Sequence, residues 1–327
     1  MIPREVLAAY GLSAADGWQL TQVRTLNNTV FSVQHRSSAE PAWALRVHRP
    51  GWRDADGVRA ELMLLEFLDQ HLPESIDVPR PGRTRADDLL VELDGRCYSL
   101  LGWLPGAPAR PDTELNADAV RLLGRGLGAV HTALDRWVGH LPAPVRWNAG
   151  TLFTAEAPGL MGRDPSDLAG VLSGADLTLF AEIAERSREI FDHADDQGLI
   201  HADYILGNCH WTSVEGRQRL GILDFDDFGS GPRPFDLGAV LGNLADFTQS
   251  WPTNAAAFVA GYRTAHPLAD ESIAALPLMI AARHAAMCLW ILGHAGADLG
   301  ADHEHIRLRM QLARERLEQD PRVFIVE

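Results

Sequence analysis

The chain has 327 residues, of which 46% are apolar and 22% are charged, and its formal net charge is -15. This length and composition exclude a disordered chain and leave room for one large domain or two lobes with a sizeable core. The acidic balance argues against a nucleic-acid-binding protein or an anionic-membrane binder, because both need basic surface. A cationic substrate or partner suits it better.

The cysteines are three in number, far apart and without a CxxC pair: Cys97, Cys209 and Cys288. We therefore expect neither a disulfide framework nor a zinc site, and we expect a cytoplasmic protein. The first residues, MIPREVLAAYG, contain an early acid and no long apolar run, so no signal peptide is expected. The most apolar segment, 273–292, is interrupted by Pro277, Arg283 and His284, which predicts a buried helix and no membrane contact.

The first hundred residues are predicted to be rich in β-structure. Residues 18–25, 29–36 and 42–49 have β-type composition and are separated by Asn-rich or Ser-rich breaks. Residues 89–104 are typical of a hairpin with Asp94-Gly95 at its turn. One helix is expected over 57–72, where apolar residues recur at helical spacing.

The rest of the chain is predicted to be mainly helical. Residues 105–111 are rich in Pro and Gly and are typical of a linker. Apolar periodicity then predicts helices around 120–130 and over 173–193, and three or four more beyond Asp236. The outline is a β-rich N-lobe (1–101), a hinge (102–111) and a helical C-lobe (112–327).

Two short motifs in the helical part carry the chemistry. HADYILGN (201–208) has the spacing H-x-D-x-x-x-x-N, which is the spacing of a kinase catalytic loop. ILDFDDFG (222–229) follows as a β-run that ends in aspartates. Phosphoryl transfer needs an Asp at the attacking hydroxyl, oxygen ligands for Mg²⁺ and cations on the phosphates. Either motif alone also occurs by chance or as a turn, but their order and spacing together favour phosphoryl transfer.

The sequence resembles the aminoglycoside phosphotransferase-like kinases. The resemblance rests on HADYILGN, ILDFDDFG and GPRPFDLG, and it extends over most of the chain through LRVHRPGWRD, RAELMLLEFL, VPRP, LLGWLPG and LLGRGLGAVH. This superfamily includes aminoglycoside, choline and type II homoserine kinases and a bacterial stress-response protein kinase. The resemblance implies an α+β, bilobal protein-kinase-like fold with a small β-rich N-lobe that contains one helix and a larger, mainly helical C-lobe. It also implies ATP and Mg²⁺ as cofactors.

The resemblance implies roles for residues of the second lobe. His201 would brace the catalytic loop, and Asp203 would be the catalytic aspartate. Asn208 and Asp224 would bind Mg²⁺. Asp236 would hold the catalytic loop through hydrogen bonds to its backbone.

In the first lobe, Glu61 would pair with a phosphate-binding cation, and Gly102 and Leu104 would offer backbone groups to adenine. Glu61 borders the apolar face of its helix, where an acid is costly unless it is paired. The alternative is a boundary glutamate that reaches solvent. Asp226 is a further metal candidate, ranked above Asp227 because alternation at a strand end would place it on the side of Asp224.

The sequence departs from the family pattern at two places. Arg46 stands where a lysine is expected, and we keep it as the phosphate cation, although a purely structural pair with Glu61 is compatible with the same position. The phosphate-covering loop TLNNTVF (25–31) has no glycine, so Asn27-Asn28 would supply its turn and Asn28 is a candidate for nucleotide binding. Ala202 replaces a frequent glycine, a change that we expect to be harmless.

We therefore expect an ATP- and Mg²⁺-dependent phosphotransferase that acts on a hydroxyl of a small molecule, with a cationic acceptor favoured by the net charge. A homoserine-like acceptor would instead need a cationic pocket, which no residue in the sequence pattern indicates. The alternatives are a protein Ser/Thr kinase of the same fold and a catalytically weak, pseudokinase-like nucleotide-binding module. The oligomeric state is left open.

Overall fold

The computed structural model describes residues 2–25, 28–108, 115–139, 145–154, 163–193, 196–248, 250–294 and 299–325. The chain forms two compact units. The first comprises Met1–Ala107, Arg136–Pro144 and His210–Asp226, and the second comprises Pro108–Asp135, Val145–Cys209 and Asp227–Glu327. These are groups of packed segments, so the lobe bounds expected from the sequence stay a prediction.

The first unit is built on an antiparallel six-stranded sheet. The strand order is β1-β2-β3-β7-β5, with β6 also paired to β7. The strands are β1 (Trp18–Thr25), β2 (Thr29–His35), β3 (Trp43–Val47), β5 (Pro81–Gly82), β6 (Leu90–Leu93) and β7 (Arg96–Gly102). Positive φ values at Asp94 (51°) and Gly95 (70°) form the turn of the β6–β7 hairpin. The three predicted strands and the predicted hairpin are confirmed.

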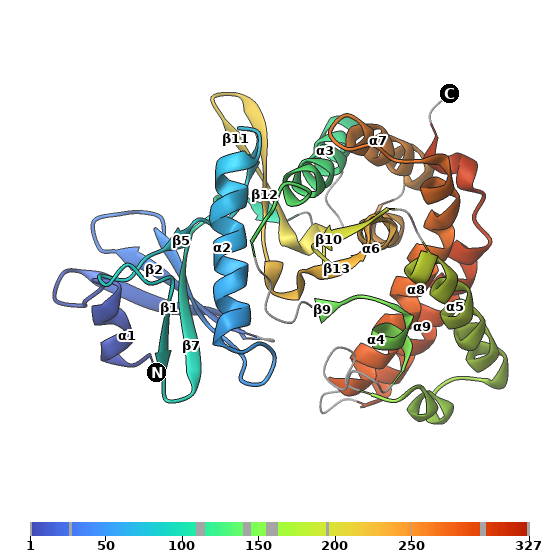
Figure 1. Cartoon of the computed structure of the whole chain (residues 1–327), viewed down its shortest axis with the longest axis horizontal. Coiled ribbons are helices and arrows are strands. Elements are labelled where there is room, and N and C mark those ends of the chain that lie inside the picture. Colours follow the sequence, from blue (N-terminus) through green and yellow to red (C-terminus); the bar gives the residue numbers. More distant parts are fainter. Residues whose placement is uncertain are drawn as a thin grey trace. The chain divides into compact units, whose positions relative to one another are not determined.

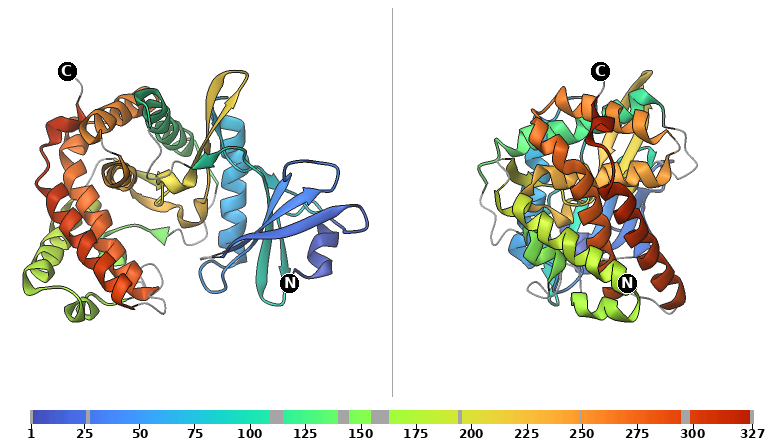
Figure 2. Two further views of the ribbon diagram at one scale, coloured as in Figure 1. Left: turned by 180° about the vertical axis from the view of Figure 1, so that it is seen from behind. Right: turned by 90° about the vertical axis from the view of Figure 1, so that its right-hand side faces the viewer.

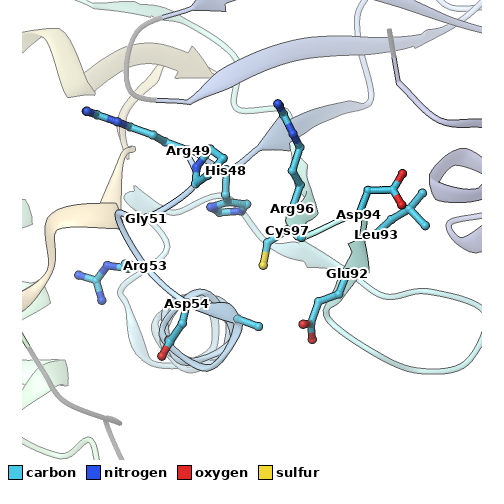
Figure 3. Close-up of a pocket in the computed structure, with 13 residues that line it drawn as sticks. His48, Arg49, Gly51, Arg53, Asp54, Glu92, Leu93, Asp94, Arg96 and Cys97 are labelled. Atoms are coloured by element: carbon cyan, nitrogen blue, oxygen red, sulfur yellow. The ribbon is translucent and has the colours of Figure 1, made fainter.

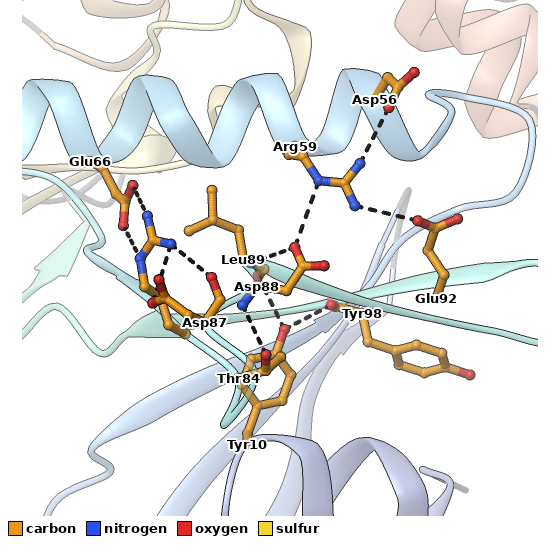
Figure 4. Close-up of polar contacts among 11 residues, drawn as sticks. Tyr10, Asp56, Arg59, Glu66, Thr84, Asp87, Asp88, Leu89, Glu92 and Tyr98 are labelled. Atoms are coloured by element: carbon orange, nitrogen blue, oxygen red, sulfur yellow. Dashed lines mark hydrogen bonds and ion pairs between the residues drawn. The ribbon is translucent and has the colours of Figure 1, made fainter.

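Helix α2 (Ala55–His71) packs against β5 and β6 (Figure 1). It begins at Asp54, whose carboxylate accepts a hydrogen bond from the amide of Gly57 at 2.8 Å. Ion pairs of Arg59 with Asp88 and of Arg83 with Glu66 connect the helix and the segment before β6 (Figure 4). These contacts fix the helix that carries Glu61. The shorter α1 (Arg4–Ala9) covers another part of the unit.

A second sheet supports the segment that ends in aspartates. Its order is β4-β12-β11-β8, made of β4 (Ile76–Asp77), β8 (Ala107–Pro108), β11 (Cys209–Val214) and β12 (Arg217–Ile222). The β11–β12 hairpin turns at Glu215 and Gly216, both with positive φ. Parallel pairing with β4 and a hydrogen bond from Arg219 Nε to Asp77 Oδ2 (2.8 Å) hold β12 in place. The chain leaves β12 two residues before Asp224.

The second unit is mainly helical, as predicted. Its α-helices are α3 (Ala117–Leu134), α4 (Ala149–Phe153), α5 (Gly174–His193), α6 (Arg233–Phe247), α7 (Trp251–Arg263), α8 (Asp270–Gly293) and α9 (Leu299–Leu317). Its 3₁₀ turns are η1 (Pro165–Gly170), η2 (Leu206–Asn208) and η4 (Pro321–Phe324), and a further turn, η3 (Phe225–Asp227), joins it to the first unit. A small sheet has the order β10-β13-β9, from β9 (Val145–Arg146), β10 (Gln197–Ile200) and β13 (Gly229–Pro232).

Close helix pairs form the core of this unit. Helix α3 lies along α7, and α8 lies along α9 and α6 (Figure 2). A Cβ at Gly124 of α3 would lie 2.0 Å from the carbonyl oxygen of Phe258 of α7, so the close approach of these helices requires glycine there. This packing places α3, which carries His131, against α7 and β10.

Helix α8 is the apolar segment noted in the sequence. By length and composition it is the one described helix that could cross a membrane, but 72% of its most apolar window is buried inside the structure. The prediction of a buried helix is therefore confirmed. Arg283 and His284 are polar interruptions in this apolar helix, and both make specific contacts within the second unit.

Candidate functional site

The loop 201–208 is held by the carboxylate of Asp236, which is fully buried near the start of α6. Asp236 Oδ2 accepts a hydrogen bond from the backbone amide of His201, and Oδ1 accepts one from the backbone amide of Ala202, each at 2.7 Å. His131 Nε2 lies 3.1 Å from Asp236 Oδ2. The expected bracing of the loop by Asp236 is confirmed.

The His131–Asp236 pair has a neutral and a charged member. Burial lowers the pKa of His131 and outweighs the opposing effect of Asp236, so the ring is neutral. Burial raises the pKa of Asp236, but the hydrogen bond from His131 and the other donors outweigh it, and the net shift is downward. The Tyr262 hydroxyl lies 2.8 Å from His131 Nδ1, which fits a ring that donates from Nε2 to Asp236.

The backbone of the loop is strained at Ala202. Its φ is 67°, in the left-handed region that costs a non-glycine residue about 1–2 kcal/mol. The backbone amides of His201 and Ala202 at this turn are the two that donate hydrogen bonds to the carboxylate of Asp236. His201 is fully buried, and its Nδ1 accepts from the amide of Asp203 at 3.3 Å. His201 therefore braces the loop from inside, as expected.

Asp203 is held through both carboxylate oxygens. Oδ1 accepts from Nη2 of Arg283 on α8, and Oδ2 accepts from Nδ2 of Asn208 at 2.9 Å. Nδ2 of Asn208 also donates to the backbone carbonyl of Asp203 at 3.0 Å. Because the amide nitrogen of Asn208 is used inside the loop, its amide oxygen is the atom left to serve a metal ion. The sequence pattern gave Asp203 and Asn208, but not Arg283.

In the first unit, Glu61 of α2 is fully buried and forms an ion pair with Nη2 of Arg46 on β3. The alternative of a solvated glutamate is wrong. Burial lowers the pKa of Arg46, but the carboxylates of Glu61, Asp226 and Asp224 together shift that pKa upward, so the guanidinium stays charged. Arg46 Nε and Glu61 Oε2 are buried without a hydrogen-bond partner in the described part of the chain. Such orphaned polar atoms fit a site completed by water or ligand.

Asp224 also has a left-handed backbone, with φ at 66°. Its carboxylate lies 3.6 Å from Arg24 Nη1 and 3.8 Å from Arg46 Nη1. Arg24, on β1, is half exposed and is a cation that the sequence pattern did not indicate. The backbone of Asp224 is strained, and its partly exposed carboxylate lies beside two guanidinium groups. This arrangement fits a site in which the carboxylate binds a cation and the guanidinium groups bind phosphate oxygens.

Asp226 is buried, and Asn28 Nδ2 donates to its Oδ2 at 2.7 Å. Strand alternation does not apply at Asp226, because residues 225–227 form a 3₁₀ turn after the left-handed Asp224, and the ranking of Asp226 as a metal candidate stays a prediction. Asn28 Oδ1 accepts from the amide of Arg49 at 3.0 Å, so both ends of its side chain are used. A phosphate contact by Asn28 would therefore come from its backbone. Asn27 lies outside the described residues.

The expected adenine contacts lie at the end of β7. The amide of Gly102 donates to the carbonyl of Arg80 at 2.8 Å, which leaves its own carbonyl as the group for a ligand. The amide of Leu104 has no hydrogen-bond partner among the described residues. Both roles stay predictions. Within the same residues no group of three or more His, Cys, Asp or Glu side chains is placed to bind a metal, so Asn208, Asp224 and Asp226 also stay predictions as ligands.

A pocket of about 500 Å³ lies elsewhere in the first unit, between the β3–α2 connection and the β6–β7 hairpin (Figure 3). Its lining includes Arg49, Arg53, Glu92 and Arg96, but none of the predicted site residues. It touches the candidate site only indirectly, since Arg53 Nε donates to the carbonyl of Asp226 at 2.6 Å. We assign it no role.

A polar cluster between α6, α8 and α9 was not indicated by the sequence. Arg309 Nη1 donates to Asp246 Oδ2 at 3.1 Å and lies 3.2 Å from His284 Nδ1. Burial, and then the charges of Arg309, Arg316 and Arg283, lower the pKa of His284 to about 3. Burial raises the pKa of Asp246 to about 6, and the nearby arginines only partly oppose this.

The lowered pKa of His284 predicts an acid-sensitive stability. Between about pH 6.5 and 3 the unfolded chain binds a proton that the folded chain excludes, so stability is lost as the pH falls through this window. We expect His284→Gln to reduce this loss by up to about 1 kcal/mol per pH unit. The measurement is the unfolding free energy in urea at several pH values. His294→Gln, at an exposed position, is the control; an equal slope in wild type and His284→Gln would contradict the prediction.

The comparisons with known proteins identify the family. Residues 20–273 match the phosphotransferase enzyme family. A protein of Deinococcus radiodurans is 30% identical over 299 residues, which cover 88% of this chain and 79% of that protein. A homoserine kinase of Methylobacterium radiotolerans is 26% identical over 292 residues, covering 84% and 79%.

Solved structures show the same fold. A microcompartment-associated aminopropanol kinase has a TM-score of 0.74 at 24% identity, covering 96% of this chain and 94% of that one. An amicoumacin kinase in complex with AMP-PNP and Ca²⁺ has a TM-score of 0.73 at 18% identity, covering 98% and 99%. The protein-kinase-like fold predicted from the sequence is thereby confirmed. The chain belongs to the phosphotransferase enzyme family and is a kinase with an alcohol group as acceptor.

Proposed function

We propose that this enzyme transfers the γ-phosphate of ATP to a hydroxyl of a small molecule in a Mg²⁺-dependent reaction. The observation that carries the proposal is the braced loop 201–208, in which Asp203 is held on both oxygens beside Asn208. Asp203 orients the attacking hydroxyl and accepts its proton. A module that only binds nucleotide has no need for an aspartate held in this way.

Residues of the first unit serve the nucleotide. Arg46, fixed by Glu61, and Arg24 supply positive charge for phosphate oxygens. The Gly102 carbonyl and the Leu104 amide serve adenine. Mg²⁺ would be held by Asn208, Asp224 and Asp226 and would neutralise charge on the phosphates.

The acceptor is a small molecule that carries an amine and a hydroxyl. The named relatives and neighbours include a homoserine kinase and an aminopropanol kinase, and both names denote compounds with an amine and a hydroxyl. The net charge of -15 favours an acceptor with a cationic group over an anionic polymer. A protein acceptor is the alternative outcome of the test below.

The test is ATP turnover with and without Mg²⁺, against amino alcohols, amino sugars and a generic protein, in wild type and in Asp224→Ala. We expect turnover stimulated by an amino alcohol. In Asp224→Ala the apparent Mg²⁺ affinity falls by at least about 10- to 100-fold, the loss that removal of an outer partner of a metal ligand already causes. Asp118→Ala, at an exposed position on α3, is the matched control.

Two results would overturn the proposal. The first is wild-type turnover in Asp224→Ala at limiting Mg²⁺. The second is the absence of turnover with every acceptor; a thermal shift on addition of Mg-ATP would then favour the nucleotide-binding-module alternative, and no thermal shift would contradict both.

A further inference from the structure

Arg283 is a cation placed directly at the reacting position. Nη2 donates to Asp203 Oδ1, and Nη1 donates to the carbonyl of Ala202 at 3.3 Å. The side chain comes from α8, a separation of 80 residues from Asp203, and is only 15% exposed. A buried guanidinium in an apolar helix is costly unless it is paired, so its position is specified by this contact.

The catalytic loop provides no cation of its own. HADYILGN contains neither Lys nor Arg, so the positive charge beside Asp203 is contributed from α8. A guanidinium carries more N–H donors than these two contacts use, and they lie in one plane. That planar set of donors matches the two oxygens of a carboxylate.

A second layer of positive charge lies behind Arg283. Arg309 of α9 is mostly buried, and the charge of Arg283 contributes to lowering the pKa of Arg309 after the larger effect of burial. The charges of Arg316, Arg309 and Arg283 add to the effect of burial in lowering the pKa of His284, so the ring of His284 is neutral. The carboxylates of Asp203, Asp246 and Glu315 lie in the same cluster as these three arginines. The case for an anionic group on the acceptor therefore rests on the remaining N–H donors of Arg283.

We propose that Arg283 is the specificity-determining residue that binds a carboxylate of the acceptor, so that the preferred substrate is a short-chain hydroxy amino acid. This inference rests on the proposed function and narrows its acceptor class. Because Arg283 is in contact with Asp203, a carboxylate on Arg283 and a hydroxyl on Asp203 are separated by only a few bonds. Arg283 would then contact both Asp203 and the carboxylate of the acceptor. An amino alcohol lacks that carboxylate and would leave Arg283 paired only with the protein.

The experiment compares acceptors that differ by one group. Homoserine has the amine, the hydroxyl and the carboxylate, whereas 3-amino-1-propanol is the same molecule without the carboxylate. The readout is the ratio of kcat/KM for the two acceptors in wild type, Arg283→Gln and Arg283→Lys. The control is Arg186→Gln, which removes an exposed arginine paired with Glu182 on α5.

We expect wild type and Arg186→Gln to prefer homoserine by about 10- to 100-fold, the effect of one charged hydrogen-bonded contact. Arg283→Gln should bring the ratio close to one, and Arg283→Lys should restore part of it, because lysine keeps the charge but not the planar donors. An equal loss for both acceptors would show that Arg283 only positions Asp203, and it would overturn the inference.

The failure of this inference is distinct from the failure of the proposed function. Turnover of 3-amino-1-propanol equal to or better than that of homoserine in wild type would leave the kinase proposal standing and overturn the role of Arg283. If no acceptor is phosphorylated, calorimetry with 2-aminobutyrate, which lacks only the hydroxyl, decides the matter. Binding to wild type that is lost in Arg283→Gln supports the carboxylate site, and no binding to wild type overturns it.

Discussion

Replacement of Asp203 by Asn is expected to lower kcat by about 10²–10⁴-fold while the affinity for nucleotide changes little. Asparagine has nearly the same shape and keeps one oxygen, but it cannot take a proton from the attacking hydroxyl. The contacts of Asp203 are to Arg283 and Asn208, which belong to the second unit, whereas the residues proposed to bind ATP belong to the first. The loss should therefore appear in kcat and not in the dissociation constant of the nucleotide.

The measurement is steady-state turnover with saturating acceptor, together with nucleotide titration by calorimetry. Asp118→Asn, which removes an exposed carboxylate from the first turn of α3, is the control for the loss of one negative charge. A kcat within a few-fold of wild type in Asp203→Asn would remove Asp203 from the catalytic role. A parallel loss of nucleotide affinity would indicate a structural effect.

The sequence was most informative where local pattern and chemistry coincide. The strands of the first sheet follow from β-type composition and turn residues, and the Asp94-Gly95 turn has the expected positive φ values. The pairing of Glu61 with Arg46 follows because an acid at the apolar border of a helix needs a cation. The bracing by Asp236 followed from family resemblance, since nothing in the local pattern shows a carboxylate bound to two amides.

The residues that were missed come together only through tertiary packing. Arg283 reaches Asp203 from a helix far along the chain, and Arg24 reaches Asp224 from the first strand. Neither contact has a periodic or motif signal. A signal for Arg283 did exist, because a charge within the most apolar helix must find a partner. In the sequence that charge indicates a buried helix and not a membrane span, but it does not identify the partner.

The alternation argument behind the ranking of Asp226 failed for a local reason. Side-chain alternation holds only while the backbone stays extended, and the left-handed residue at Asp224 ends the extended conformation. A non-glycine residue with positive φ is uncommon and is not predictable from an aspartate alone. The same applies to Ala202, whose conformation depends on the hydrogen bonds that the amides of His201 and Ala202 donate to Asp236.

Substitution of Asp236 by Asn is expected to destabilise the protein by about 3–5 kcal/mol. The fully buried carboxylate accepts from two backbone amides and from His131, and an amide nitrogen in place of one oxygen would face a donor. The left-handed turn at Ala202 would lose the contacts that hold it. Activity should therefore also fall at temperatures where the variant is still folded.

Asp246→Asn is the informative control, because both aspartates lie on α6, Asp236 fully and Asp246 partly buried, but their pKa values shift in opposite directions. Burial raises the pKa of Asp246 to about 6, so its charge is a cost at neutral pH, although its carboxylate also pairs with Arg309. We therefore expect Asp246→Asn to destabilise the protein less than Asp236→Asn does. Because the folded state lowers the pKa of Asp236, its charged carboxylate stabilises the fold fully at pH values above 3.8, the ordinary pKa of the group. This stabilisation is lost as the pH falls through the pKa of Asp236 in the folded state. The unfolding free energies in urea of wild type and Asp236→Asn should accordingly converge only in strong acid. Equal effects of the two substitutions at neutral pH would show that burial, and not the bracing of the catalytic loop, determines the cost.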